Sequence, residues 1–177
     1  GGTVQSVATD NSGHGEIAIT GGTFAKDVSK YLSDGYVQDE NGVVAPLNAD
    51  NAAAMIGATP YATFEKAVSA ANATDNATIT LLKDVVVTET VKPEKNMIID
   101  LNGKTIKGDD ARVFQVLAGT LNLTGKGTVT TVIPKDGKLL TTSSVIRVGD
   151  NVTEGKATNN VAAGIILGKD VTIEAPD

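Results

Sequence analysis

The stretch "NMIIDLNGKTIKG", residues 96–108, places two short apolar segments on either side of an Asn-Gly pair. Asn-Gly is the strongest two-residue signal for a β-hairpin, so a hairpin is the first interpretation. The same pattern recurs, however, because "IDLNGKTI" aligns with "LNLTGKGTV" so that Leu101 corresponds to Leu123, 22 residues later. A repeated corner explains the recurrence better than one hairpin does. It predicts that Asn102-Gly103 joins two faces of a coiling chain.

A second pair of segments has a related spacing. In "LLKDVVVTE" and "LGKDVTIEA", the first Lys-Asp-Val begins at Lys83 and the second at Lys169, 86 residues later, which is close to four times 22. A period of about 20–25 residues made of short strands and tight turns is typical of a solenoid. We therefore expect an all-β fold for residues 77–177, a parallel β-helix with rungs of about 22 residues. An antiparallel sandwich is the alternative, whereas leucine-rich repeats need more leucines than the chain has.

The composition suits thin, regular layers. Aromatic residues make up only 3% of the chain and tryptophan is absent, while apolar residues make up 41%. The core must therefore consist of Val, Ile, Leu and Ala, and the charged share of 20% fits a chain that folds.

One helix is expected ahead of the strands. Thr59 is a suitable N-cap and Pro60 suits the first helical position. Phe64, Ala67, Val68 and Ala71 then form a narrow apolar stripe at helical spacing over "YATFEKAVSAAN". Such a stripe fits closely against a flat surface, so the helix is expected to cap the fold.

The residues before this helix give weaker signals. "GEIAITGG" alternates apolar and small or polar residues and predicts a short strand that contains Ile17 and Ile19. The spacing of apolar residues in "TFAKDVSKYL" predicts a second helix, which ends at Gly35. "YVQDENGVV" predicts a small hairpin with Asn41-Gly42 at its turn.

Charge and cysteine content exclude several classes of function. The net charge of −6 argues against nucleic acid and anionic membrane surfaces as partners. The chain has no cysteine, which excludes disulfides, thiolate metal sites and a cysteine nucleophile. No apolar run reaches the roughly 18 residues of a membrane span, and no signal peptide is visible. We expect neither nucleic-acid binding nor membrane insertion.

Candidate catalytic residues are few. His14 is the only histidine and lies in a Gly-rich loop, so neither a triad nor a histidine metal site is expected. "GDDAR" places Asp109 and Asp110 beside Arg112, and these two aspartates are the weak candidates for a metal site. Their spacing fits no calcium-loop pattern, so a solvated turn is the simpler interpretation. We expect no catalytic residue and no cofactor.

The segment "YATFEKAVSAANATDNATITLLKDVVVTETVKPEKNMIIDLNGKTIKG" resembles the opening of right-handed parallel β-helix modules in cell-surface proteins of bacteria, especially gut Firmicutes. "GEIAITGGTFAKDVSKYLSDGYVQDENGVV" resembles the last strand and terminator of such modules. The resemblance implies a right-handed parallel β-helix with an N-terminal capping α-helix, located outside the cell on a bacterial surface.

The order of these parts predicts the domain organisation. Residues 1–22 would complete a neighbouring or preceding solenoid, residues 23–58 would be a terminator or linker, and residues 59–177 would hold the capping helix and β-helix. The last strand then leaves an open edge, because no terminator follows it. An open edge of this kind pairs with other strands. We expect the assembly edge to comprise Ile17, Ile19, Val171 and Ile173.

These expectations favour a non-catalytic structural or adhesive module of a bacterial surface protein or fibre. Its partners would be copies of itself, or adjacent repeats of the same chain, joined head to tail. Host or cell-wall glycans are possible further ligands. The alternative is a glycan-binding or polysaccharide-degrading, lyase-like module, which would require several acids and an arginine on one face.

Overall fold

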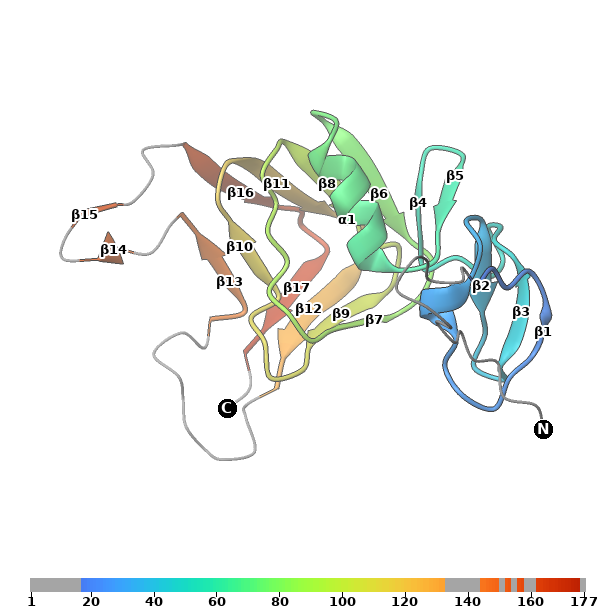
Figure 1. Cartoon of the computed structure of the whole chain (residues 1–177). Coiled ribbons are helices and arrows are strands. Elements are labelled where there is room, and N and C mark those ends of the chain that lie inside the picture. The colour runs from blue at the N-terminus through green and yellow to red at the C-terminus, as the bar shows by residue number, and fades with distance from the viewer. Residues whose placement is uncertain (1–16, 133–143, 150–151, 154–155, 158–161, 176–177) are drawn as a thin grey trace, which may run out of the picture. The chain divides into compact units, whose positions relative to one another are not determined.

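The computed structural model describes residues 17–132, 144–149, 152–153, 156–157 and 162–175 (Figure 1). The chain divides into two compact units, Gly1–Asn51 and Ala52–Asp177. The finer division predicted at residues 22 and 58 stays a prediction. The strand residues expected before Ile17 lie outside the described part.

The first unit contains a three-stranded antiparallel sheet. Its elements are β1 (Gly22–Thr23), the 3-10 helix η1 (Ser29–Tyr31), β2 (Tyr36–Gln38) and β3 (Val43–Pro46), and the strand order is β1-β3-β2. Strands β2 and β3 form the predicted hairpin, with Gly42 at a φ of 80° in its turn.

The helix predicted over "TFAKDVSKYL" is wrong, because only Ser29–Tyr31 is helical and no residue of that segment is buried. Gly35 does adopt the left-handed conformation, with a φ of 78°, although it ends a turn rather than an α-helix. Ahead of β1, Ile19 forms a parallel bridge to Leu32.

The second unit contains one α-helix and a series of short strands among its described residues. They are β4 (Ala54–Ile56), β5 (Thr59–Tyr61), α1 (Phe64–Asn72), β6 (Ala77–Leu81), β7 (Val85–Val87), β8 (Met97–Asp100), β9 (Thr105–Gly108), β10 (Phe114–Val116), β11 (Gly119–Thr124), β12 (Gly127–Thr131), β13 (Ile146–Val148), β14 (Val152–Thr153), β15 (Lys156–Ala157), β16 (Ala163–Leu167) and β17 (Val171–Glu174).

Two larger sheets carry most of these strands. The six-stranded sheet has the order β16-β11-β8-β6-β4-β5, and the four-stranded sheet has the order β17-β12-β9-β7. Strands β6, β8, β11 and β16 pair in parallel, whereas β4 and β5 join the sheet antiparallel. The four-stranded sheet is entirely parallel. Two small sheets, β10-β13 and β14-β15, lie outside them.

The predicted fold class, an all-β right-handed parallel β-helix or β-solenoid, is therefore wrong. The described residues form several separate sheets, which are antiparallel, mixed or parallel, together with one α-helix, as in a small α/β-like fold. The prediction assumed a repeat of constant length, but the offsets between paired strands are not constant. Ile79 pairs with Ile99 after 20 residues, Ile99 with Leu123 after 24, and Leu123 with Leu167 after 44.

The sequence alignment of the repeats is also displaced. Leu123 pairs with Ile99 rather than with Leu101, and Val85 shares a row with Ile173 rather than with Val171. Both displacements are two residues, which keeps every side chain on the same face of its strand. The pattern of apolar residues cannot detect such a shift.

Asn102-Gly103 does form a corner and not a hairpin, since β8 before it and β9 after it belong to different sheets. Asn102 has a φ of 48° and Gly103 a φ of 77°. The Asn102 side chain donates a hydrogen bond of 2.8 Å to the carbonyl of Leu81, the last residue of β6. This bond connects the corner after β8 to the end of β6.

Helix α1 covers one end of the core. Its N-cap is Thr63, whose hydroxyl accepts a hydrogen bond from the backbone of Lys66, whereas Thr59 and Pro60 belong to β5. The predicted apolar stripe is confirmed, because Phe64, Ala67, Val68 and Ala71 are its buried residues. Phe64 contacts Phe114 edge to face, with ring centroids 6.3 Å apart. The helix packs against β4, β5 and β6 (Figure 1).

Candidate assembly site

The end of the core opposite α1 has an incompletely covered apolar layer. Cross-strand partners point to the same face of a sheet, so Leu121 and Leu123 stand in line with Ile165 and Leu167. Leu121 and Leu123 are fully buried, but Leu167 is 49% exposed and Ile165 is only half-buried. The core thus ends at β16 without a further layer among the described residues.

The four-stranded sheet ends in the same way. Val129 and Ile106 are fully buried, and Ile173, which pairs with Val129, is half-buried. Val171 is likewise half-buried and packs against the core cluster. Together Ile165, Leu167, Val171 and Ile173 form what we call the open end.

Backbone groups that have no partner among the described residues accompany these side chains. Directly after β16, Gly168 donates to the carbonyl of Leu123 (2.8 Å), so the backbone of Gly168 faces β11. The N–H and C=O of successive strand residues alternate between the two sides. The backbone groups of Ile165 and Leu167 consequently point away from β11, toward the edge that has no neighbour among the described strands.

The same alternation applies to β17. Gly127 donates to the carbonyl of Asp170 (3.3 Å), so Asp170, Thr172 and Glu174 face β12. The backbone of Ile173 and the carbonyl of Val171 therefore face outward, while the N–H of Val171 donates to Gly168 within the turn. The open end offers apolar side chains and hydrogen-bonding groups together, which are the two requirements for adding a strand.

The opposite edge of the six-stranded sheet differs. Strand β5 is the edge strand there, and it contains Pro60, which has no N–H to donate. Helix α1 packs beside it. Proline on an edge strand and a covering helix are both devices that discourage pairing, so only one end of this sheet is suited to it.

The predicted edge residues fall in different units. Val171 and Ile173 lie at the open end of the second unit. Ile17 and Ile19 lie in the first unit, where Ile17 is half-buried and Ile19 is 8% exposed. Sequence reasoning missed Ile165 and Leu167, although the apolar run "GIIL" just ahead of the repeated "KDV" could have indicated them.

Asp109 and Asp110 do not gather into a metal site with other acids in the described part of the chain. Both are exposed at a turn, in which Asp110 has a φ of 56°. Arg112 instead donates from Nε to the Ser144 backbone carbonyl (3.2 Å) and hydroxyl (3.1 Å). Burial, followed by the nearby charge of Arg147, lowers the pKa of Arg112. His14 lies outside the described residues.

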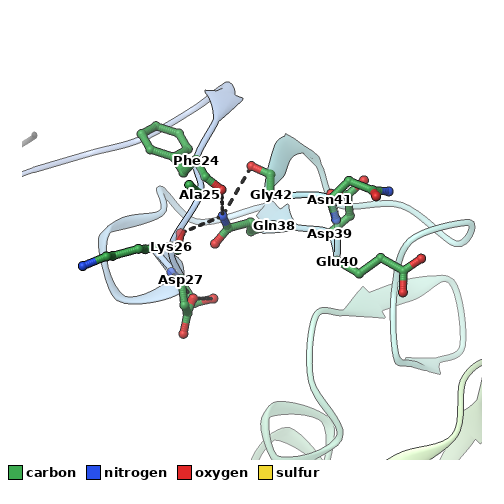
Figure 2. A pocket seen from close by; sticks show the side chains of 10 residues that line it. Phe24, Ala25, Lys26, Asp27, Gln38, Asp39, Glu40, Asn41 and Gly42 are labelled. Atoms are coloured by element: carbon green, nitrogen blue, oxygen red, sulfur yellow. Dashed lines mark hydrogen bonds between the residues drawn. The ribbon is translucent and has the colours of Figure 1, made fainter. Parts of the chain in front are cut away.

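A hollow of about 330 Å³ lies in the first unit (Figure 2). Gln38 organises it, because its side-chain nitrogen donates to the carbonyls of Lys26 (3.0 Å), Phe24 (3.4 Å) and Gly42 (3.3 Å). Asp27 accepts from the hydroxyl and N–H of Ser29, and these bonds lower the pKa of Asp27.

The labelled side chains around this hollow diverge in Figure 2 rather than converge on one point. The Gln38 amide is already used by the backbone, and Asp39 accepts from the backbone of Asn41 and Val43 in its own turn. The hollow therefore follows from the conformation of the loop whose carbonyls Gln38 holds in place.

No helix within the described residues is long and apolar enough to cross a membrane. Comparison of the chain with protein-family models, curated proteins and solved structures finds no match.

Proposed function

We propose that the chain is a non-catalytic structural or adhesive module of an extracellular bacterial surface protein or fibre, which assembles head to tail with copies of itself. The resemblance of residues 61–108 to modules of bacterial surface proteins supports the location. The observation that carries the assembly is the difference between the two ends of the core. One end is covered by α1, and the other presents the half-exposed open end.

The energetic reason is the apolar area left at the open end. Burying a Leu or Ile side chain completely contributes roughly 1.5–3 kcal/mol, so each half-buried side chain there has about 1 kcal/mol still to gain. Outward backbone groups of Ile165, Leu167 and Ile173 would gain partners at the same time. A partner that adds strands recovers both contributions, and this favours association of copies.

Sedimentation velocity over a range of concentrations tests the proposal. The native chain is expected to form species larger than a monomer as concentration rises. Leu167→Lys places a charge in the open end and should abolish them. Ile166→Lys is the matched control, because Ile166 is 54% exposed but is the neighbour of Leu167 on the other face of β16.

A native chain that stays monomeric at every concentration would refute the proposal. Equal loss of assembly in the Leu167 and Ile166 variants would also contradict it, since the effect would then come from charge alone. The polysaccharide-degrading alternative gains no support from the geometry, because Arg112 is directed to Ser144.

A further inference from the structure

Residues 17–20, "IAIT", contain an isolated bridge at Ile19, so one side of this extended segment is engaged and the other is exposed. The N–H of Ile19 donates to the carbonyl of Tyr31 (2.8 Å), and its carbonyl accepts from Ser33 (3.0 Å). Because backbone groups alternate along a strand, those of Ala18 and Thr20 point to the opposite side. Both residues are exposed, and no described residue pairs with that side.

We propose that residues 17–20 of a second copy add to β17 in parallel, with Ile19 of that copy beside Ile173. This inference rests on the assembly proposed above and names the strand that provides it. The donor strand would stand in the row that runs through Val85, Ile106, Val129 and Ile173.

The backbone groups of the two strands are complementary in this register. The N–H of Ile173 meets the carbonyl of Ala18, and the carbonyl of Ile173 meets the N–H of Thr20. The carbonyl of Val171 meets the N–H of Ala18. All of these groups are the outward-facing ones identified above, and the N–H of Val171, which the register does not use, is already bonded to Gly168.

The side chains agree with the same register. Ile17 and Ile19 come beside Val171 and Ile173, so apolar residues stand in line as they do in the existing rows. A slip by one residue would bring Ala18 and Thr20 into the core layer and turn the paired backbone groups away. Parallel pairing also matches the existing neighbours of both strands. Strand β17 already pairs with β12 in parallel, and Ile19 already forms a parallel bridge to Leu32.

Charge favours this donor over pairing of two open ends. Residues 17–20 carry no charge, so Glu174 would meet Thr20. Two β17 strands related by a two-fold axis through Thr172 would set Asp170 opposite Glu174 twice, and like charges directly opposite are destabilising.

Disulfide crosslinking tests the register, and the native chain has no cysteine to interfere. Chains with Ala18→Cys are mixed with chains carrying Thr172→Cys under a mild oxidant. The register makes these residues cross-strand neighbours about 4.8 Å apart, within disulfide reach. Ala18→Cys mixed with Glu174→Cys is the control, because two residues of offset raise the Cα separation to about 8 Å, which is beyond reach.

The expected result is a crosslinked dimer from the first mixture and its loss in the control mixture, beyond any product that each variant forms alone. Assembly of the native chain with no crosslink from the first mixture, or with equal crosslinking in both, would overturn this donor and leave the proposed assembly standing. A crosslink formed inside single chains that carry both Ala18→Cys and Thr172→Cys would overturn the second copy as donor. Absence of any assembly by the native chain would overturn both proposals.

Discussion

Gly125 lies where the corner after β11 meets the corner after β8. Its φ is 72°, and a Cβ placed on it would overlap Oδ1 of Asp100. That oxygen accepts the backbone N–H of Asn102 at 2.9 Å. An alanine at this position must therefore adopt a left-handed conformation and also displace the Asp100 side chain.

The two costs can be estimated separately. The left-handed conformation costs about 1–2 kcal/mol for a non-glycine residue. Losing the hydrogen bond that the Asn102 N–H donates to Asp100 adds about 1 kcal/mol, since the bond is exposed to solvent. We expect Gly125→Ala to lower the free energy of unfolding by about 2–3 kcal/mol.

Gly103→Ala is the matched control. Its φ is 77°, but nothing lies within 4 Å of a Cβ placed there, so only the conformational cost of about 1–2 kcal/mol applies. Urea unfolding followed by circular dichroism measures both variants. The decisive comparison adds Asp100→Ala, in which Gly125→Ala should cost less than it does in the native chain, because the closest contact of the added Cβ is then gone. An unchanged cost of Gly125→Ala with and without Asp100 would refute the steric reasoning.

Three further changes have expected outcomes. Phe64→Ala removes a fully buried ring against Phe114 and should destabilise the chain by about 3–5 kcal/mol in urea unfolding; a loss below about 1 kcal/mol would mean that α1 does not cover the core. Thr63→Ala removes the N-cap of α1 and should cost about 1 kcal/mol in the same assay, against no change if the cap is not formed. The carboxyl of Asp27 should titrate below its ordinary pKa in NMR, and Ser29→Ala should raise that pKa, whereas an unshifted pKa in both chains would contradict the hydrogen bonds. Because the folded pKa is the lower one, the contribution of Asp27 to stability is present above the unfolded pKa of about 3.9 and is lost as pH falls through the folded value.

Local features were predictable where nearby residues decide them. The stripe of α1 needs only helical spacing, and the hairpin of β2 and β3 needs only its turn at Gly42. The start of the helix was misplaced, since Thr59 and Pro60 join β5 beside β4, and pairing with a distant strand is not visible in a short sequence window. Tertiary pairing overrode local propensity there.

The long-range pairing could not be read from the sequence. Apolar residues alternate with a period of two, so a shift of two residues between strands leaves the pattern unchanged. That ambiguity placed Leu101 rather than Ile99 beside Leu123 and produced an even repeat of 22, on which the incorrect solenoid fold was based. For the same reason Leu167 could not be identified from the sequence. Its exposure is significant only because it pairs with the buried Leu123.

Amide hydrogen exchange of Ile173, measured by NMR as a function of protein concentration, tests the central claim most directly. Its N–H points outward from β17, so it should exchange rapidly in dilute solution and become protected as copies associate. The amide of Val129, inside the same sheet, should stay protected throughout. Exchange of Ile173 that does not change with concentration, while larger species form, would show that the open end is not where copies bind.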